Sequence, residues 1–324
     1  MKKIIGIGNA LTDVLVKVDD DKILAELNLP KGSMQLIGEP QLPAIRQAMS
    51  QMTISKATGG SAGNSMLALA NLGAKPGFIG KIGNDETGNF YASNAAAKGI
   101  VPTLVQSTLP SGIAHTFITP DGERTFATFL GAAGSMEADD LKTDMFEGYD
   151  YLYIEGYLVQ NHTLILHAIQ LAKEKGLKVC IDLASYNIVA AEHDFFEELL
   201  TKYIDIVFAN KEEAIAYTGK QPDEALEQLA KTCEIAIVKL GEKGSSVMYK
   251  GEKTFVGCSK INVVDTTGAG DFYAGGFMYG VLQGWSMERC AKAGTLLAGH
   301  VIQTVGTALP ETEWEEIRTV VKNL

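Results

Sequence analysis

Apolar residues in the second half of the chain fall in short continuous runs, separated by segments with helical periodicity. Continuous apolar runs of this length are typical of strands that are buried on both faces. We predict four such strands, at residues 151–155, 177–182, 205–209 and 234–240. Helices are predicted between and after them, at residues 162–175, 194–203, 212–218 and 223–232. This alternation predicts an α/β fold with a mostly parallel central sheet and helices on both faces.

The first half of the chain contributes to the same sheet and then departs from the pattern. Residues 4–7 and 77–82 read as buried strands, and residues 39–52 and 87–98 read as helices. The glycine-rich segment 57–64 leads directly into a further helical run. Beyond the alternating region we expect two short strands and two long helices, near residues 245–249 and 254–258 and from about residues 270 and 286.

A hairpin is predicted in the middle of the chain. Residues 113–119 and 124–129 are rich in β-forming side chains, and the turn-forming residues 120–123 lie between them. Because an isolated hairpin is marginally stable in water, it must pack on other strands. We place it in a small sheet, or lid, made of residues 13–38 and 100–130. The remainder of a single domain, residues 1–324, would form the α/β core.

Composition and charge limit the possible partners and compartment. The formal net charge of −11 disfavours nucleic acid as a partner. The four cysteines (Cys180, Cys233, Cys258 and Cys290) are far apart in sequence and form no C-x-x-C pair, which fits a reducing compartment. No apolar stretch reaches membrane-spanning length. We therefore expect a cytoplasmic protein without a membrane or nucleic-acid partner.

The most specific motif is Asp265-Thr266-Thr267-Gly268-Ala269-Gly270-Asp271, which directly precedes the apolar run 272–282. A glycine-rich turn at a helix start presents a concave set of N–H groups, and the helix dipole adds positive charge. Such a site suits the charge on a transferring phosphoryl group. A carboxylate there, Asp271, can accept the proton of a substrate hydroxyl. The simpler alternative is an aspartate N-cap after a flexible turn.

A second motif, Gly59-Gly60-x-x-x-Asn64, also stands where a loop becomes a helix. Adjacent glycines allow a ligand to approach the backbone closely, and the Asn64 amide can donate to a hydroxyl and accept from one. The alternative is an ordinary glycine turn followed by an exposed asparagine.

Two further motifs follow predicted strands. In Asn210-Lys211-Glu212-Glu213, the first and last residues share a face of the first helical turn and could hold Mg²⁺ through water. A capping box explains the same spacing. The segment from Lys239 to Gly244 forms a tight turn whose N–H groups could meet a nucleotide phosphate, but a plain hairpin turn is equally consistent.

In this order, the motifs resemble those of the PfkB, or ribokinase-like, family of carbohydrate and nucleoside kinases. The resemblance covers nearly the whole chain, from residues 6–13 to residues 306–310. It implies a three-layer sandwich with a small β-sheet lid, and transfer of a phosphoryl group from ATP, with Mg²⁺, to a hydroxyl of a small molecule. Neither a G-x-x-x-x-G-K-[ST] loop nor the motifs of protein kinases are present.

The resemblance also implies a role for each matching position. These are Asp271 as the base; Gly268, Ala269 and Gly270 as the anion hole; Arg124 as a lid arginine that approaches the phosphate; Asp13, Gly59, Gly60 and Asn64 as ligands of substrate hydroxyls; Asn210 and Glu213 as the groups that organise Mg²⁺; and Lys239, Gly241 and Gly244 in the turn that meets ATP. Some family members bind a monovalent cation such as K⁺ near Asp265 and Thr267, but residues 303–306 differ from the ribokinase form of that loop.

Residues 9–13 and 120–125 are most similar to the adenosine-kinase-like branch, which favours adenosine or another nucleoside as acceptor over ribose or fructose. An adenine site should offer an aromatic face. The candidates are Phe117, Phe126, Phe129 and Tyr157.

Two other functions stay open, and so does the oligomeric state. A non-catalytic sugar- or nucleoside-binding regulator could share the fold, although it would not need Asp271, Asn210 and Glu213 together. A nicotinamide-dependent dehydrogenase is disfavoured, because Gly6-Ile7-Gly8 is followed by Leu11 where a third glycine is required. The protein could be a monomer or a homodimer through an exposed edge of the lid.

Overall fold

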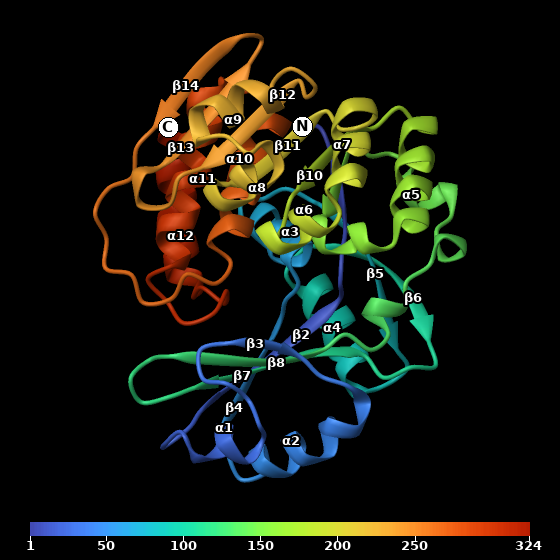
Figure 1. The fold of residues 1–324 in the computed structure, drawn as a ribbon, viewed down its shortest axis with the longest axis vertical. Coiled ribbons are helices and arrows are strands. Elements are labelled where there is room, and N and C mark those ends of the chain that lie inside the picture. The colour runs from blue at the N-terminus through green and yellow to red at the C-terminus, as the bar shows by residue number, and fades with distance from the viewer.

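The computed structural model describes residues 1–324 and contains two separate sheets (Figure 1). The main sheet runs parallel from one edge to β12 and then adds two antiparallel strands. Its strands, in spatial order, are β6 (Val101–Ser107), β5 (Gly77–Gly83), β1 (Ile4–Ile7), β9 (Tyr151–Glu155), β10 (Lys178–Asp182), β11 (Ile206–Asn210), β12 (Ile235–Lys239), β13 (Ser245–Tyr249) and β14 (Glu252–Val256).

Helices cover both faces of the main sheet, so its strands are apolar on both sides. In β9, for example, Tyr151 and Tyr153 enter one core, and Leu152 and Ile154 enter the other. The first core is closed by α3 (Ser61–Asn71), α4 (Glu86–Ala97), α10 (Ala269–Gln283) and α11 (Met287–Val301). The second is closed by α5 (His162–Glu174), α6 (Tyr186–Ala191), α7 (His193–Lys202), α8 (Lys211–Thr218) and α9 (Pro222–Leu229). The predicted three-layer α/β fold is confirmed.

The outermost helix packs on this assembly rather than on the sheet. In α12 (Glu311–Asn323), the buried residues Trp314, Ile317 and Val321 join a smaller cluster with side chains of α10 and α11. No helix of the structure combines the length and the apolar character needed to cross a bilayer.

The small sheet has the order β3 (Met34–Leu36), β8 (Arg124–Phe129), β7 (Gly112–Ile118), β2 (Leu11–Lys17), β4 (Ile54–Thr58). One face carries side chains such as Val14, Val16 and Phe117, which pack under α1 (Lys22–Glu26) and α2 (Leu42–Met49). Figure 1 shows these two helices on the side of the small sheet away from the main body. The other face, which includes Asp13 and Leu15, is therefore turned toward the main body.

Several boundaries differ from the sequence-based expectation, and three of these differences concern the lid. Residues 101–107 form β6 in the main sheet instead of a lid strand, because β5, α4 and β6 make a β–α–β unit whose strands must run parallel. Residues 54–58 instead join the lid as β4. The predicted helix at 39–52 is shorter, since Glu39–Gln41 form a 3₁₀ turn and α2 ends at Met49.

Candidate active site

Four neighbouring strands of the main sheet end on polar residues. The strand β9 ends at Glu155, β10 at Asp182, β11 at Asn210 and β12 at Lys239. The strands are parallel and in register, so that Glu155 pairs with Asp182 and Asn210 with Lys239. Ligands of open α/β sheets bind outside the carboxyl ends of the strands. These polar side chains therefore gather where a ligand is expected.

The predicted base, Asp271, lies in the first turn of α10 beside this edge. Its two carboxylate oxygens accept hydrogen bonds from Ser61 Oγ at 2.6 Å and from Asn64 Nδ2 at 2.9 Å. The side chain keeps partial contact with solvent. Burial nevertheless raises the pKa of Asp271 to about 6, and the two donors act in the opposite direction. The carboxylate is thus fixed in orientation and retains lone pairs for another donor.

The turn before Asp271 leaves backbone N–H groups without partners. Gly268 adopts a φ of +74°, which suits glycine. The N–H groups of Gly268, Gly270 and Asp271 make no hydrogen bond within the protein. The N–H of Ala269 instead donates to the carbonyl of Thr266 at 3.2 Å. The amides available to an anion are those of the other three residues.

The start of α3 approaches the same place. Gly59 is buried, and a Cβ atom on it would overlap the carboxylate of Asp13. Gly60 follows with a φ of +83°. Burial raises the pKa of Asp13 to about 7, the negative charge of Asp271 adds to the effect, and Arg124 opposes it. The carboxylates of Asp13 and Asp271 therefore belong to one site, and the backbone of Gly59 and Gly60 lies beside them without side chains.

The side chain of Asn64 has an unused hydrogen-bonding atom. Asn64 is 5% exposed, and its Nδ2 donates to Asp271. Its Oδ1 is buried and has no partner. A buried acceptor without a donor is unusual in folded proteins. Asn64 therefore offers an acceptor to a hydroxyl group of a bound molecule.

We expect Gly59→Ala to raise the KM for the acceptor by about tenfold or more, because the added methyl group would displace the Asp13 carboxylate. Initial rates at saturating ATP measure this effect. The matched control is Gly38→Ala, where a Cβ atom would come no closer than 3.4 Å to Pro40. The control should stay within about twofold of the wild type. An unchanged KM in Gly59→Ala would contradict a substrate-binding role for Asp13.

Lys239 turns away from the loop that follows it. Its Nζ donates to Asp182 Oδ2 at 2.7 Å and lies 3.1 Å from where a Cβ atom on Gly270 would stand. Lys239 thus sits beneath the start of α10, whereas the sequence placed it in the turn that meets ATP. The turn itself is closed by a hydrogen bond from Gly244 N to Gly241 O at 3.0 Å.

Asn210 and Glu213 form a capping box at the start of α8. Asn210 donates from its backbone N at 2.7 Å and from Nδ2 at 2.6 Å to the two Glu213 oxygens. Glu213 N donates in return to Asn210 Oδ1 at 2.8 Å. The simpler interpretation of this motif is confirmed.

The charges around Lys239 are suited to a bound cation. Asp182, Glu213 and Asp271 all act on Lys239, and one ammonium group cannot balance three carboxylates. Burial raises the pKa of Glu213 to about 7. Such a surplus of negative oxygen donors fits Mg²⁺, which keeps part of its hydration shell. Because Glu213 is 2% exposed and already bonded to Asn210, the residues fit an ion held through water.

Arg124 connects the lid to the glycine turn. Its guanidinium pairs with Asp265 and donates to Thr267 Oγ1. The Asp265 carboxylate also accepts hydrogen bonds from Thr267 N at 2.7 Å and from Gly306 N at 2.6 Å. A Cβ atom on Gly306 would be 3.1 Å from Leu15 of the lid. The lid therefore contacts the main body at the predicted anion hole.

The two site carboxylates predict the pH dependence of the reaction. The pKa is raised to about 7 for Asp13 and to about 6 for Asp271, and both should act in the ionised form. As the pH falls below about 7, first one and then the other binds a proton. We therefore expect kcat/KM for the acceptor to fall by at least about tenfold per pH unit, and more steeply below about pH 6. Direct measurement of ADP between pH 5 and 9 tests this, and a flat profile down to pH 5 would contradict it.

The four aromatic candidates separate into two groups. Phe117 and Phe129 are buried in the lid core under α2, so a substrate cannot reach them. Phe126 lies on the lid face that is turned toward the main body, because it pairs with Thr116 and Thr116 pairs with Leu15. Tyr157 is 39% exposed, and burial of its hydroxyl, followed by the charges of Glu155 and Asp271, raises its pKa to about 12.

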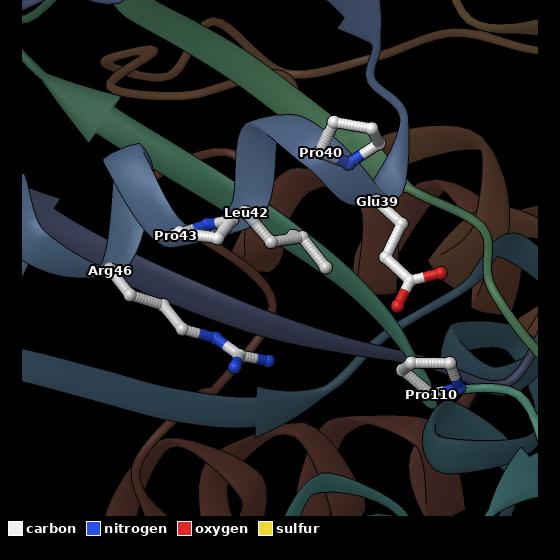
Figure 2. A pocket seen from close by; sticks show the side chains of 6 residues that line it. All are labelled: Glu39, Pro40, Leu42, Pro43, Arg46 and Pro110. Atoms are coloured by element: carbon white, nitrogen blue, oxygen red, sulfur yellow. The ribbon is translucent and has the colours of Figure 1, made fainter.

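A separate surface hollow lies between α2 and the connection from β6 to β7 (Figure 2). Its volume is about 420 Å³, and its lining includes Glu39, Arg46 and three prolines. It contains none of the carboxylates or free amides described above. It is therefore distinct from the candidate active site.

Three residues of the site are not predicted from the sequence. Ser61, Glu155 and Asp182 all make hydrogen bonds to, or next to, the predicted groups. The sequence indicates two of them, because Glu155 and Asp182 are the last residues of predicted parallel strands, where ligands bind. It indicates Ser61 more weakly, as the residue that follows the glycine pair.

Known proteins match the chain over most of its length. The pfkB family of carbohydrate kinases matches residues 33–314. Adenosine kinase 2 of Arabidopsis thaliana is 28% identical, with 95% of this chain and 96% of that protein covered. A probable sugar kinase from Rhizobium etli CFN 42 has a similar structure, with 32% identity, a TM-score of 0.87, and 100% and 99% of the two chains covered. For adenosine kinase from Sinorhizobium meliloti the identity is 34%, the TM-score is 0.85, and 99% of each chain is covered.

The fold and these matches define a phosphotransferase that acts on a hydroxyl group. Kinases of this kind use ATP, usually with Mg²⁺. The chain belongs to the PfkB family of carbohydrate and nucleoside kinases.

Proposed function

We propose that the protein transfers the γ-phosphate of ATP to a hydroxyl group of a nucleoside, with adenosine as the favoured acceptor. The observation that carries this proposal is the apolar inner face of the lid. Strand pairing puts Leu15, Phe126, Met34 and Leu36 on the same face as Asp13. Met34 and Leu36 are 54% and 64% exposed there. An apolar face can pack against a purine ring, but it provides few hydrogen-bonding groups for the hydroxyls of a sugar.

The polar end of the site suits the ribose part of such an acceptor. Asp13 and the unpartnered Asn64 Oδ1 can accept from hydroxyl groups. Asp271 takes the proton of the reacting hydroxyl, while Ser61 and Asn64 hold the carboxylate in place. The oxygen then attacks the γ-phosphorus in line, while the bond from the γ-phosphorus to the bridging oxygen breaks and ADP leaves. The free amides of Gly268 and Gly270 stabilise the charge that develops on the phosphoryl oxygens.

The remaining residues serve ATP and its metal. Asn210 and Glu213 would hold Mg²⁺ through water, and the ion would shield the negative phosphates. The turn containing Gly241 and Gly244 would lie near the nucleotide. Arg124 would bring positive charge from the lid to the phosphates, and closure of the lid would exclude water from the transfer.

An ADP-release assay with a panel of acceptors tests the proposed function. We expect turnover with adenosine at lower KM than with ribose, fructose or 5-dehydro-2-deoxygluconate. Buffers with K⁺ and with tetramethylammonium should be compared, because the backbone near Asp265 and Thr267 is the expected site of a monovalent cation. Activity with sugars alone would overturn the nucleoside assignment.

A sugar kinase is the second candidate. It is favoured by the similarity to the probable sugar kinase of Rhizobium etli CFN 42 and to 5-dehydro-2-deoxygluconokinase of Bacillus subtilis, which is 28% identical with 84% of this chain and 88% of that protein covered. Phe126→Ser distinguishes the two candidates. It should raise the KM for a nucleoside and leave that for a sugar almost unchanged.

The cellular setting forms part of the proposal. All four cysteines are free, and three of them are buried, which supports a reducing, cytoplasmic location. The lid sheet ends in the edge strands β3 and β4, through which a homodimer could form. Sedimentation equilibrium distinguishes this dimer from a monomer.

A further inference from the structure

Two chain segments that join the main sheet to the lid lie against each other. The first is 8–10, between β1 and β2, and the second is 59–62, which runs from the end of β4 into the first turn of α3. Gly59 N donates to Leu11 O at 2.8 Å. A Cβ atom on Gly60 would overlap the carbonyl oxygen of Asn9. The two crossings are therefore packed backbone to backbone and must move together.

The carboxylate of Glu155 lies beneath this contact and binds both segments. Glu155 is 2% exposed. Its Oε1 accepts from Asn9 Nδ2 at 2.6 Å, and its Oε2 accepts from Ala62 N at 3.0 Å. A Cβ atom on Gly8 would stand 2.5 Å from Oε2, so the carboxylate occupies the space that a side chain would need. Each oxygen thus holds a different crossing.

The hydrogen bond from Ala62 N to Glu155 lies next to the residues that hold the predicted base, Asp271. Ala62 is in the first turn of α3, next to Ser61 and two residues before Asn64. Ser61 and Asn64 are the two side chains that donate to Asp271. Any shift of this helix start would therefore change the orientation of the Asp271 carboxylate, and small displacements of reacting groups slow catalysis strongly.

The charge of Glu155 is difficult to explain by stability alone. No lysine or arginine pairs with it, and a buried carboxylate without a cation is costly. Burial raises the pKa of Glu155 to about 7, and the hydrogen bonds from Ala62 and Asn9 oppose this. Two acceptor oxygens are needed at this position because Asn9 Nδ2 and Ala62 N both donate hydrogen bonds to it. Glutamine would offer one oxygen and set an NH₂ group against the other donor.

We propose that Glu155 is a positioning residue for phosphoryl transfer: it clamps the two core-to-lid crossings together and thereby aligns Ser61 and Asn64 against Asp271. This inference rests on the proposed role of Asp271 as the base.

Glu155→Gln tests the proposal in two backgrounds. In the wild-type background kcat should fall by about ten- to a hundredfold, while the KM for ATP stays within about twofold. In the Asp271→Asn background the same substitution should change kcat by less than about twofold, because its effect passes through Asp271. The matched control is Asp205→Asn. Asp205 likewise accepts a backbone N–H bond, from Val179 at 2.7 Å, but lies at the opposite end of the sheet and should leave kcat within about twofold.

Three results separate the possible failures. If Glu155→Gln behaves like the Asp205 control, or lowers kcat equally in both backgrounds, the positioning role is overturned. If Asp271→Asn retains full turnover, the proposed base is wrong, whatever Glu155 does.

If circular dichroism shows that Glu155→Gln does not fold, Asn9→Ser replaces it. This variant removes one of the two clamped bonds and should lower kcat by about three- to tenfold, and an unchanged kcat would overturn the clamp.

Discussion

Asp271→Asn is expected to lower kcat by about 10²–10⁴-fold while the protein stays folded. The asparagine keeps the size of the side chain, but its amide cannot take the proton of the acceptor hydroxyl. The KM for ATP should change little, because Asp271 approaches the acceptor rather than the nucleotide. Single-turnover transfer from labelled ATP measures the residual rate, and circular dichroism checks the fold.

Asp85→Asn provides the matched control for that variant. Asp85 is also an aspartate at a helix start, where it accepts from Gly88 N at 2.8 Å, but it lies at α4 and outside the candidate site. Its substitution should leave kcat within about twofold of the wild type. If Asp271→Asn lost no more activity than this control, another group would have to be the base.

Lys239→Met is expected to destabilise the protein by about 3–5 kcal/mol, because it leaves Asp182 as a buried carboxylate without its cation. The side chains of Lys239 and Asp182 are only 15% and 6% exposed. Although burial opposes the charged form, Asp182 and Glu213 raise the pKa of Lys239, so the ammonium is charged in the folded state. Urea unfolding followed by tryptophan fluorescence measures the loss.

Two companion variants make the prediction specific. Adding Asp182→Asn to Lys239→Met should restore part of the stability, since the unpaired charge is then gone. Lys173→Met breaks the pair with Asp205, whose side chains are 39% and 26% exposed, and should cost less than about 1 kcal/mol. Equal losses in Lys239→Met and Lys173→Met would contradict the buried pair.

Local sequence patterns predicted most of the main sheet. The strand at 151–155 is predicted with its observed bounds, and the helix at 162–175 differs by one residue at its end. Both signals are local, because an apolar run or a helical period is contained in the segment itself. The sequence places residues 101–107 in the lid, whereas they form the edge strand β6 of the main sheet. No local pattern shows that this strand pairs with β5, because the pairing depends on chain topology.

The candidate site divides in the same way. Asp271, Gly268 and Gly270 stand within four residues of one another, so their chemistry could be read from the sequence. The partners of Asp271 could not, because Ser61 and Asn64 come from a helix more than 200 residues earlier. Likewise, the segment from Asn210 to Glu213 predicts the start of α8. Nothing in that segment predicts that Lys239 lies beneath the start of α10.

The sequence by itself determined the α/β class, the glycine turn at the start of α10 and the kinase family, because each depends on residues close together in the chain. Only the tertiary structure decided which lid strands face the site, which amides stay free and how Glu155 joins two distant segments. These features depend on side chains and backbone groups that meet only after folding, and their contacts leave no periodic or local trace in the chain.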